Sequence, residues 1–503
     1  MKKLFTRVLT LVVALVATSV VGVSSAGGSC AGASTGGDWP SYGHDLANTR
    51  TQDQEDTIGA GNAGNLTADW AFDLTAQGGT GTIQSTPIVA DGCMYAATTT
   101  GYLFALNADS GDVVWSRQFI ANGAFGGMWS PSIVDGVLYA IVSNSGATTV
   151  VALNDQTGGT LWESPPVATD TGSFSNASAV VFDGLIFVGI SGAEGGHSRS
   201  GGWAIVDATD GTVLVRDFTV SQADYDIGYS GGSMWGTAVV DPATEYLYEG
   251  TGQPSNSAVR HEHQYTNAIV KIDVARARDI DGSPVESATI TNKKFGEIVD
   301  AYKGLTDYGH APLDGNTTCQ VHTAGCVLFD SDFGASPNLF TNSRGFTMVG
   351  AYQKTGIYHA LYADGMTRAW TNTMSQMIGP PYLANAASSA YDGKQIINVG
   401  AFPGQMVAAE RDFGAYTWVS PTGGGTNYNP TETANGVAYI NDDKGFLHAV
   451  DTSNGVPLLA HPMEADTGTV CTPGLTSGGA AIARHTVFST CGSWVIAYRL
   501  PAA

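Results

Sequence analysis

A few short segments of the sequence carry side chains that can take part in chemistry. Glu194 and Asp332 are carboxylates in glycine-containing segments, where a carboxylate can bind a divalent cation or accept a proton. Trp235 is flanked by glycines in the segment 232–236, which leave the face of its indole open as a flat platform. Lys354 lies at an expected junction between a strand and a turn and offers a cation there.

Each of these side chains also has an ordinary interpretation. Glu194 is then a polar residue of a glycine-rich turn, Trp235 a core aromatic and Lys354 a solvated surface cation. Asp332, two residues before Gly334, is then a turn-forming aspartate. Residue type alone leaves both interpretations open, so the decision depends on the elements that position these residues.

Those elements come from a repeat that runs along the chain. It consists of an alternating strand, a small residue, an acidic or amide residue, glycine, and a second strand often closed by tryptophan. The clearest copies end at Trp115 and Trp162, and a truncated copy, residues 494–500, closes the chain. Weaker copies lie around Asp207, Asp273, Tyr362, Glu410 and Asp451, which makes eight in all.

The segments between copies contain dipeptides typical of tight hairpins, which require a positive φ. They are Asp91-Gly92, Asp135-Gly136, Asp183-Gly184, Asp392-Gly393 and Asn435-Gly436. Short antiparallel strands repeated at roughly forty to ninety residues are typical of a propeller rather than a sandwich. We therefore predict an all-β fold, an eight-bladed β-propeller.

The last repeat lacks its outer strand, and residues 68–74 have the pattern to supply it. The last blade is then closed by N-terminal and C-terminal strands, which removes two exposed sheet edges. The tryptophans at the blade ends are predicted to dock one blade on the next and not to hold a cofactor. They are Trp115, Trp162, Trp370 and Trp418.

The N-terminus is typical of an export signal. Lys2, Lys3 and Arg7 precede an apolar run over 8–23, and we expect cleavage after Ala26, with a retained membrane anchor as the alternative. The predicted location is the periplasm or the cell exterior.

The remaining chain divides into an N-terminal extension, 27–66, and the propeller, 67–503. A long spacing predicts an insertion at about 274–330. Because blade loops on one face converge on the axis, this insertion is expected to cover or wall a site there.

Composition narrows the class of partner. The formal net charge is −23, which repels polyanions and argues against nucleic acid and anionic membrane surfaces. Among six cysteines, Cys319 with Cys326 and Cys471 with Cys491 are the preferred disulfides, and other pairings stay open. No Cys-x-x-Cys-His motif occurs, so a covalent c-type haem is excluded and any electrons must leave to a separate carrier.

Three segments carry a family resemblance. Residues 39–50, Trp-Pro-Ser-Tyr-Gly-His-Asp-Leu-Ala-Asn-Thr-Arg, resemble the N-terminal segment of pyrroloquinoline quinone (PQQ) dehydrogenases, as does the tryptophan-closed repeat. Residues 332–339 and 353–361 most resemble the polyvinyl alcohol dehydrogenase branch. The resemblance covers essentially the whole mature chain and implies the propeller of quinoprotein alcohol dehydrogenases.

The resemblance also implies an activity, namely oxidation of an alcohol, polymeric and secondary alcohols included, with PQQ and Ca²⁺. Electrons would pass to an external acceptor such as a cytochrome, with no membrane span left after signal cleavage. Asp332 matches the catalytic base of the family. The implied metal ligands are Glu194, Gln253 and Asp332, and the implied cofactor contacts are Ser191, Ser233, Trp235, Lys354 and Asn176. For Asn176, the ordinary interpretation is a polar turn residue.

Several departures put the chemistry in doubt. The adjacent cysteine pair of methanol-oxidising relatives is missing, and Trp129 or Ser130 replaces a nearby arginine. Gln253 stands where the family usually offers asparagine to calcium, and its extra methylene would shift the metal. Gly334 stands where lanthanide-using relatives add an aspartate, which favours Ca²⁺. The alternative function is a non-enzymatic propeller that serves as a binding or assembly scaffold.

Overall fold

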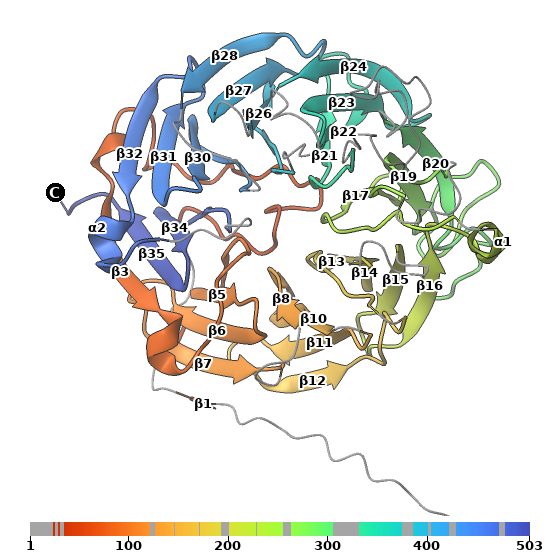
Figure 1. Ribbon diagram of the computed structural model, residues 1–503, viewed down its shortest axis with the longest axis horizontal. Coiled ribbons are helices and arrows are strands. Elements are labelled where there is room, and N and C mark those ends of the chain that lie inside the picture. The colour runs from red at the N-terminus through yellow and green to blue at the C-terminus, as the bar shows by residue number, and fades with distance from the viewer. Residues whose placement is uncertain are drawn as a thin grey trace, which may run out of the picture.

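The computed structural model describes most of the chain. The residues outside the description are 1–23, 26–28, 31–34, 121–125, 145, 171, 193–200, 228, 255–262, 305–330, 375–385, 401–403, 422–428, 472–477 and 503. The described residues form eight sheets of four or five strands, in which every pair is antiparallel except β2 with β29. Figure 1 shows these sheets as blades around a central axis. The predicted eight-bladed β-propeller is confirmed.

In each of the first four blades the strands follow one another from the axis to the outer edge. They are β4 (Ile88–Ala90), β5 (Cys93–Ala97), β6 (Tyr102–Asn107), β7 (Val113–Gln118); β8 (Gly126–Met128) with β9 (Ser132–Val134), β10 (Val137–Asn144), β11 (Thr149–Asn154), β12 (Thr160–Glu163); β13 (Val180–Phe182), β14 (Leu185–Ile190), β15 (Gly202–Asp207), β16 (Val213–Phe218); and β17 (Val239–Asp241), β18 (Tyr246–Gly250), β19 (Ala268–Asp273), β20 (Ile298–Lys303).

The other four blades follow the same order. They are β21 (Asn338–Thr341), β22 (Thr347–Gln353), β23 (Ile357–Tyr362), β24 (Thr367–Thr373); β25 (Ala390–Tyr391), β26 (Gln395–Gly400), β27 (Gln405–Glu410), β28 (Tyr416–Pro421); β29 (Glu432–Ala434), β30 (Val437–Asn441), β31 (Phe446–Asp451), β32 (Pro457–Pro462); and β33 (Ala481–Ala483), β34 (Thr486–Cys491), β35 (Trp494–Arg499), β3 (Thr67–Asp73). The short helices are η1 (Ala63–Asn65), η2 (Leu74–Gln77), α1 (Gln222–Asp226) and α2 (Glu464–Thr467).

The ring closes with strands from both ends of the chain. β3 pairs with β35 from Thr67 opposite Arg499 to Asp73 opposite Trp494. In Figure 1 the red-orange β3 lies against the blue β35. The predicted closure by residues 68–74 is confirmed, within one residue at each end.

Both faces of the middle strands are buried because each blade packs between two others. In β18, Leu247 packs with residues of the third blade and its neighbour Tyr248 with residues of the fifth. Successive side chains of a middle strand therefore point in turn to the two neighbouring blades, and not alternately to a core and to solvent. This explains the largely apolar inner strands that the repeat contains.

Tryptophans dock four blades on their neighbours as predicted. Trp115 donates its indole N–H to the Asp155 carbonyl at 2.7 Å, and a Cβ added to Gly158 would lie 2.7 Å from its ring. Trp162, Trp370 and Trp418 repeat the hydrogen bond in later blades. Each ring also lies against a glycine of positive φ in the next blade: Gly211, Gly414 and Gly455.

The hairpin turns are largely as predicted. Asp91, Asp135, Asp183 and Asn435 have φ of 51°, 51°, 46° and 43°. Asp392 is not among the residues with a positive φ, although Gly393 has a φ of 89°.

The expected insertion at about 274–330 is not continuous. β20 lies within this range and pairs with β19, so it is the outer strand of the fourth blade. Residues 305–330, which were expected to wall a site, lie outside the described residues.

The described disulfides are Cys471–Cys491, as predicted, and Cys30–Cys93, which was not among the preferred pairs. Cys319 and Cys326 lie outside the description. So does the expected signal peptide, 1–26, apart from β1 (Ser24–Ser25), which pairs with β7. No helix in the described part of the chain is long and apolar enough to cross a lipid bilayer.

Residues 37–50 of the N-terminal extension cross the interior of the ring, and we name them the axial clasp (Figure 1). Their main-chain groups hydrogen-bond to seven of the eight blades. The bonds are Arg484 N to Gly37 O, Trp39 N to Val89 O, Ile133 N to Pro40 O, Val240 N to Leu46 O, Leu339 N to Ala47 O, Tyr391 N to Thr49 O and Thr433 N to Arg50 O. After the clasp, β2 (Thr51–Gln52) pairs in parallel with β29.

An ion pair with both side chains fully buried ends the clasp. The Arg50 guanidinium lies 2.5 Å from Glu432 Oε1 and 4.4 Å from the centroid of the Tyr42 ring. It also donates to the carbonyls of Tyr42 and Thr431 at 2.9 and 3.2 Å. Burial raises the pKa of Glu432 to about 7, although Arg50 acts to lower it.

We expect Gly158→Ala to lower the free energy of unfolding by about 2–4 kcal/mol, because the methyl group meets the Trp115 ring and φ is positive. The matched control is Gly436→Ala, whose φ is +79° but whose Cβ would meet nothing within 4 Å. That control should cost about 1 kcal/mol from backbone strain alone. Chemical denaturation measures both, and equal losses would contradict the docking role of Trp115.

We expect the stability of the protein to depend on pH through Glu432. A carboxyl whose folded pKa is raised contributes stability below its unfolded pKa, and that contribution is lost as pH rises through about 7. Glu432→Gln removes this loss, so the melting temperature of the variant should rise relative to the native chain between about pH 4.5 and 7.5. The exposed control Glu286→Gln should show no such trend, and a pH-independent difference for Glu432→Gln would refute the assignment.

Candidate active site on the propeller axis

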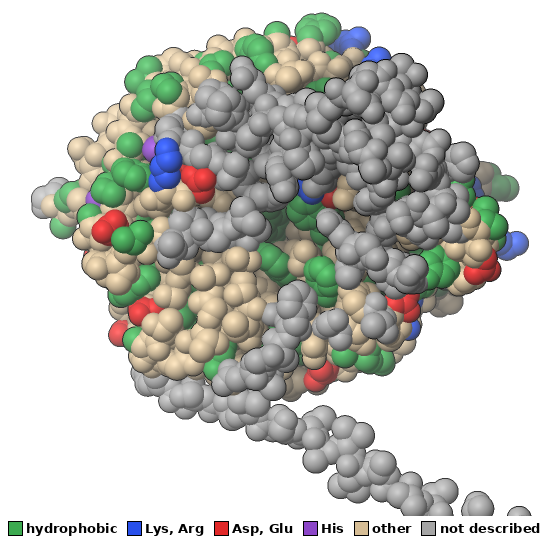
Figure 2. Space-filling view, in the orientation of Figure 1, with side chains coloured by type: hydrophobic (Ala, Val, Ile, Leu, Met, Phe, Trp, Pro, Cys, Tyr) green, Lys and Arg blue, Asp and Glu red, His purple; other side chains and the backbone are tan. Residues whose placement is uncertain are grey.

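The site segments lie at one end of the blades. In an up-and-down blade, the start of the innermost strand and the end of the second strand share an end. Asn176, Trp235 and Asp332 precede the innermost strands β13, β17 and β21, while Gln253 and Lys354 follow the second strands β18 and β22. Segments far apart in sequence therefore meet on one face, and Figure 2 shows that face hollowed near its centre.

Trp235 is held by a close approach of the chain. A Cβ added to Gly334 would lie 2.0 Å from Cζ2 of the indole, so only glycine permits the ring to lie here. The Lys354 ammonium lies 4.9 Å from the centroid of the same ring. The indole face thus attracts the ammonium, which brings a positive charge and a flat aromatic surface together at one place.

The Asp332 carboxylate is fixed by two donors. Oδ2 lies 3.1 Å from Lys354 Nζ, and Oδ1 accepts the main-chain N–H of Gln253 at 2.5 Å. Asp332 is 4% exposed and Lys354 7% exposed, so water screens this pair only weakly. The structure confirms that Trp235, Lys354 and Asp332 are neighbours.

Two serines connect the other expected segments to this centre. Ser233 Oγ accepts the N–H of Gly192 at 3.2 Å, and its carbonyl accepts the N–H of Gly252 at 2.8 Å. Ser191 Oγ donates to the Met234 carbonyl at 3.5 Å. A Cβ added to Gly252 would lie 3.5 Å from Asp332 Cγ, so Ser191, Ser233 and Asp332 belong to one contiguous cluster.

An axial cavity of about 120 Å³ adjoins this cluster. Trp235 and Asn176 line it, and Tyr42 of the axial clasp contributes to its wall. Trp129 and Ser130, the two residues that could stand in place of the family's arginine, also line it, and Trp129 donates its indole N–H to the Ser175 carbonyl at 3.0 Å. Asn176 is therefore in position to meet a ligand on the axis.

The expected metal ligands are only partly described. Glu194 lies outside the described residues. Gln253 reaches Asp332 through its main-chain N–H, so its side-chain amide is a separate group that can still face a cation. Asp332 and Gln253 thus lie together, and metal binding by all three expected ligands stays a prediction.

Sequence reasoning missed two buried acids near the axis. One is Glu432, because its partner Arg50 is 382 residues away in the chain. The other is Glu249, which is fully buried behind Gly236, next to Trp235. Burial raises the pKa of Glu249 well above its usual range. The available sequence signal for Glu249 was a carboxylate between Tyr248 and Gly250, inside a strand that is largely buried.

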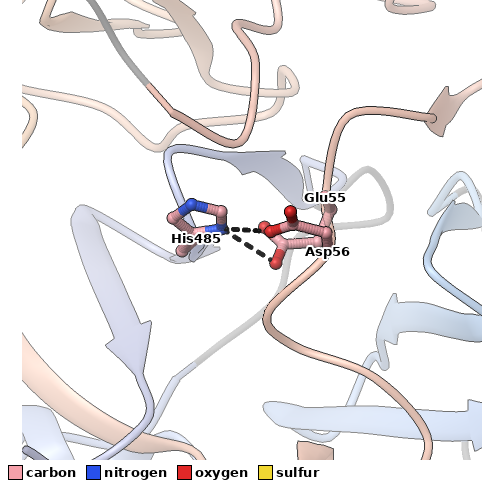
Figure 3. A group of neighbouring side chains, drawn as sticks. All are labelled: Glu55, Asp56 and His485. Carbon is pink, nitrogen blue, oxygen red and sulfur yellow. Dashed lines mark hydrogen bonds and ion pairs between the residues drawn. The ribbon is translucent and has the colours of Figure 1, made fainter.

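A second cluster of potential metal ligands lies away from the axis. The carboxylates of Glu55 and Asp56 and the imidazole of His485 have donor atoms within 4.8 Å of one another (Figure 3). Glu55 Oε1 lies 3.0 Å from His485 Nδ1 and already accepts the N–H groups of Thr57 and Ile58. We interpret the cluster as an ion pair that ties the end of the N-terminal extension to the last blade.

Comparison with known proteins supports the family resemblance. A family model described as glucose/ethanol/alcohol dehydrogenase, beta-propeller domain, matches residues 39–128. A polyvinylalcohol dehydrogenase of Pseudomonas sp is 25% identical over 77% of this chain. The quinohemoprotein alcohol dehydrogenase ADH IIB of Pseudomonas putida is 27% identical over 87% of this chain and 71% of its own length.

The chain is shorter than several of these relatives. It spans 60% of the Pseudomonas sp enzyme and 37% of a quinohemoprotein alcohol dehydrogenase from Comamonas testosteroni. The crystal structure of quinohemoprotein alcohol dehydrogenase from Comamonas testosteroni superposes with a TM-score of 0.66, covering 93% of this chain and 82% of that one at 16% identity. BamB from Moraxella catarrhalis superposes less closely, with a TM-score of 0.54 over 86% and 99% of the two chains at 12% identity. By sequence this chain is similar to quinoprotein alcohol dehydrogenases, and by fold it shares their eight-bladed β-propeller.

Proposed function

We propose that this protein is a quinoprotein alcohol dehydrogenase that uses PQQ and Ca²⁺ and passes electrons to an external acceptor. The single observation that carries the proposal is the arrangement of Lys354, which contacts the Trp235 ring and the Asp332 carboxylate together. A planar, anionic redox group needs an aromatic floor and a cation, and alcohol oxidation needs a base. One cluster of three side chains offers all of these.

The residues present fit the cofactor in kind. Trp235 would form the floor under the quinone, Lys354 would donate to its oxygens, and Ser191, Ser233 and Asn176 would offer polar contacts around its edge. Glu194, Gln253 and Asp332 would offer oxygen ligands to Ca²⁺. When bound, PQQ supplies a two-electron oxidant and Ca²⁺ a Lewis acid.

The protein's own contribution centres on Asp332. Its carboxylate accepts the hydroxyl proton of the alcohol, and its two fixed donors orient the oxygen that takes it. Lys354 offsets negative charge near the carboxylate, while the Trp235 indole covers one side of the site and the axial cavity adjoins it. Since Lys354 competes with a proton for Asp332, the lysine must turn toward another oxygen as the proton arrives.

We further propose that substrates include polymeric and secondary alcohols, because residues 332–339 and 353–361 are similar to the polyvinyl alcohol dehydrogenase branch. Export to the periplasm or the cell exterior is supported by the disulfides Cys30–Cys93 and Cys471–Cys491, which persist in oxidising compartments. The absence of a Cys-x-x-Cys-His motif favours a separate electron carrier such as a cytochrome.

The test adds PQQ and Ca²⁺ to the purified chain and follows bound-quinone absorbance and alcohol-dependent dye reduction. We expect both signals, with Asp332→Asn lowering kcat by about 100-fold or more because the base is lost, while quinone absorbance is retained. The exposed control Asp226→Asn should behave as the native chain. Failure of both signals in a folded native protein would favour the scaffold function instead.

A further inference from the structure

A chain of buried hydrogen bonds leads to the peptide bond that precedes Asp332. Gln353 Nε2 donates to the Ser331 carbonyl at 2.7 Å. Gln353 Oε1 lies 3.1 Å from His359 Nε2, and His359 Nδ1 lies 3.1 Å from the hydroxyl of Tyr302. Ser331 and Gln353 are 0% exposed and His359 is 3% exposed, so these contacts are protected from water.

Chemistry fixes the direction of every hydrogen bond in this chain. The Ser331 carbonyl only accepts, so the amide nitrogen of Gln353 must face it and the amide oxygen must face His359. Burial lowers the pKa of His359 to about 4, so the imidazole is neutral near pH 7 and carries one proton. That proton must be on Nε2, which leaves Nδ1 to accept from the Tyr302 hydroxyl.

The hydrogen-bond chain ends at the main chain next to Asp332, whose position determines the geometry of the site. Gln353 holds the carbonyl before Asp332, and the next residue, Lys354, donates its main-chain N–H to the Asp332 carbonyl at 2.9 Å. Lys354 also pairs with the Asp332 side chain. Phe333 completes the support, since its ring lies 5.2 Å from that of His359 and its N–H donates to Thr251 O at 3.2 Å.

We propose that Tyr302, His359 and Gln353 are positioning residues that fix the main chain of Asp332 through this proton-ordered chain, an inference that rests on the proposed dehydrogenase function. Tyr302 belongs to β20 of the fourth blade and His359 to β23 of the fifth. The hydrogen-bond chain therefore makes the position of Asp332, the proposed base, depend on the separation of the fourth and fifth blades. A displacement of about 1 Å at a reacting group can cost about 100-fold in rate.

The first test needs no cofactor. In the apoprotein, ¹⁵N histidine spectra should show His359 as the neutral Nε2–H tautomer at pH 7, and Tyr302→Phe should move the Nδ1 resonance, because Nδ1 loses its donor while Gln353 keeps the proton on Nε2. Tyr439→Phe removes a buried hydroxyl in the seventh blade and is the matched control. A native His359 protonated on Nδ1 would overturn the chain.

The second test measures the support of Asp332 by hydrogen exchange of the Phe333 amide. His359→Leu removes the His359 donor from the Gln353 amide oxygen and should speed exchange by about tenfold or more. His359→Gln should restore slow exchange, because its amide can donate to Gln353 and accept from Tyr302. If His359→Leu fails to fold, Tyr302→Phe replaces it with a smaller expected increase, and unchanged exchange refutes the positioning role.

The third test uses the protein loaded with PQQ and Ca²⁺. Tyr302→Phe and His359→Leu should lower kcat by about tenfold or more, with KM and the Kd for PQQ within about twofold, and His359→Gln should recover kcat. Equal losses for His359→Gln and His359→Leu would contradict the proposal. If the native protein oxidises no alcohol, the proposed function fails, while the tautomer and the Phe333 amide still decide the hydrogen-bond chain.

Discussion

The innermost strand of each blade has an edge that its own sheet cannot satisfy. In a closed ring these edges all face the axis, where unpaired N–H and C=O groups would be costly once water is excluded. The axial clasp provides hydrogen-bond partners for these edges from a single segment, because its main chain bonds to seven blades. Its end is held by the ion pair of Arg50 with Glu432. Because the clasp also contributes Tyr42 to the cavity wall, the same interaction closes the ring and bounds the site.

The clasp explains why one region of the axis stays open. No clasp bond to the third blade occurs in the described part of the chain, and a second cavity of about 310 Å³ lies there between the clasp and β13. The two cavities share Tyr42 and Thr237 as lining residues. The second cavity therefore lies beside the one blade to which the clasp's main chain makes no hydrogen bond within the described residues.

The sequence predicted the ring because its signals are local and repeated. Alternating strands, Asp-Gly turns and blade-end tryptophans are each visible within a window of about twenty residues. Eight copies of the repeat could therefore be found without knowing which other residues they contact. Closure by β3 was predictable because the last repeat visibly lacked a strand. β20 was missed since it stands apart from the glycine turn that marks the other outer strands, with a connection of residues 274–297 before it.

The site was predicted less completely, for a physical reason. Trp235 and Asp332 could be found because their segments resemble those of the PQQ dehydrogenases, and the structure adds that Gly334 lies against the indole. The contacts that orient them join residues far apart in sequence, such as Gln253 with Asp332, and leave no local pattern. The same holds for Arg50 with Glu432, where a single arginine in a polar segment gives no sign that it will be fully buried.

The blade junctions next to the site depart from the regular docking. Between the third and fourth blades, Trp203 rather than an outer-strand tryptophan donates to the Gly296 carbonyl. Between the fourth and fifth, buried Lys271 donates to the carbonyls of Ala363 and Asp364 and lies 4.2 Å from the Tyr246 ring centroid. Each of these junctions keeps a side-chain donor on a main-chain carbonyl of the next blade, as the blade-end tryptophans do. Around the fourth blade the donor comes from the third strand, β15 or β19, and not from the outer strand, so the blades that carry Trp235 and Asp332 are joined through buried residues nearer the axis.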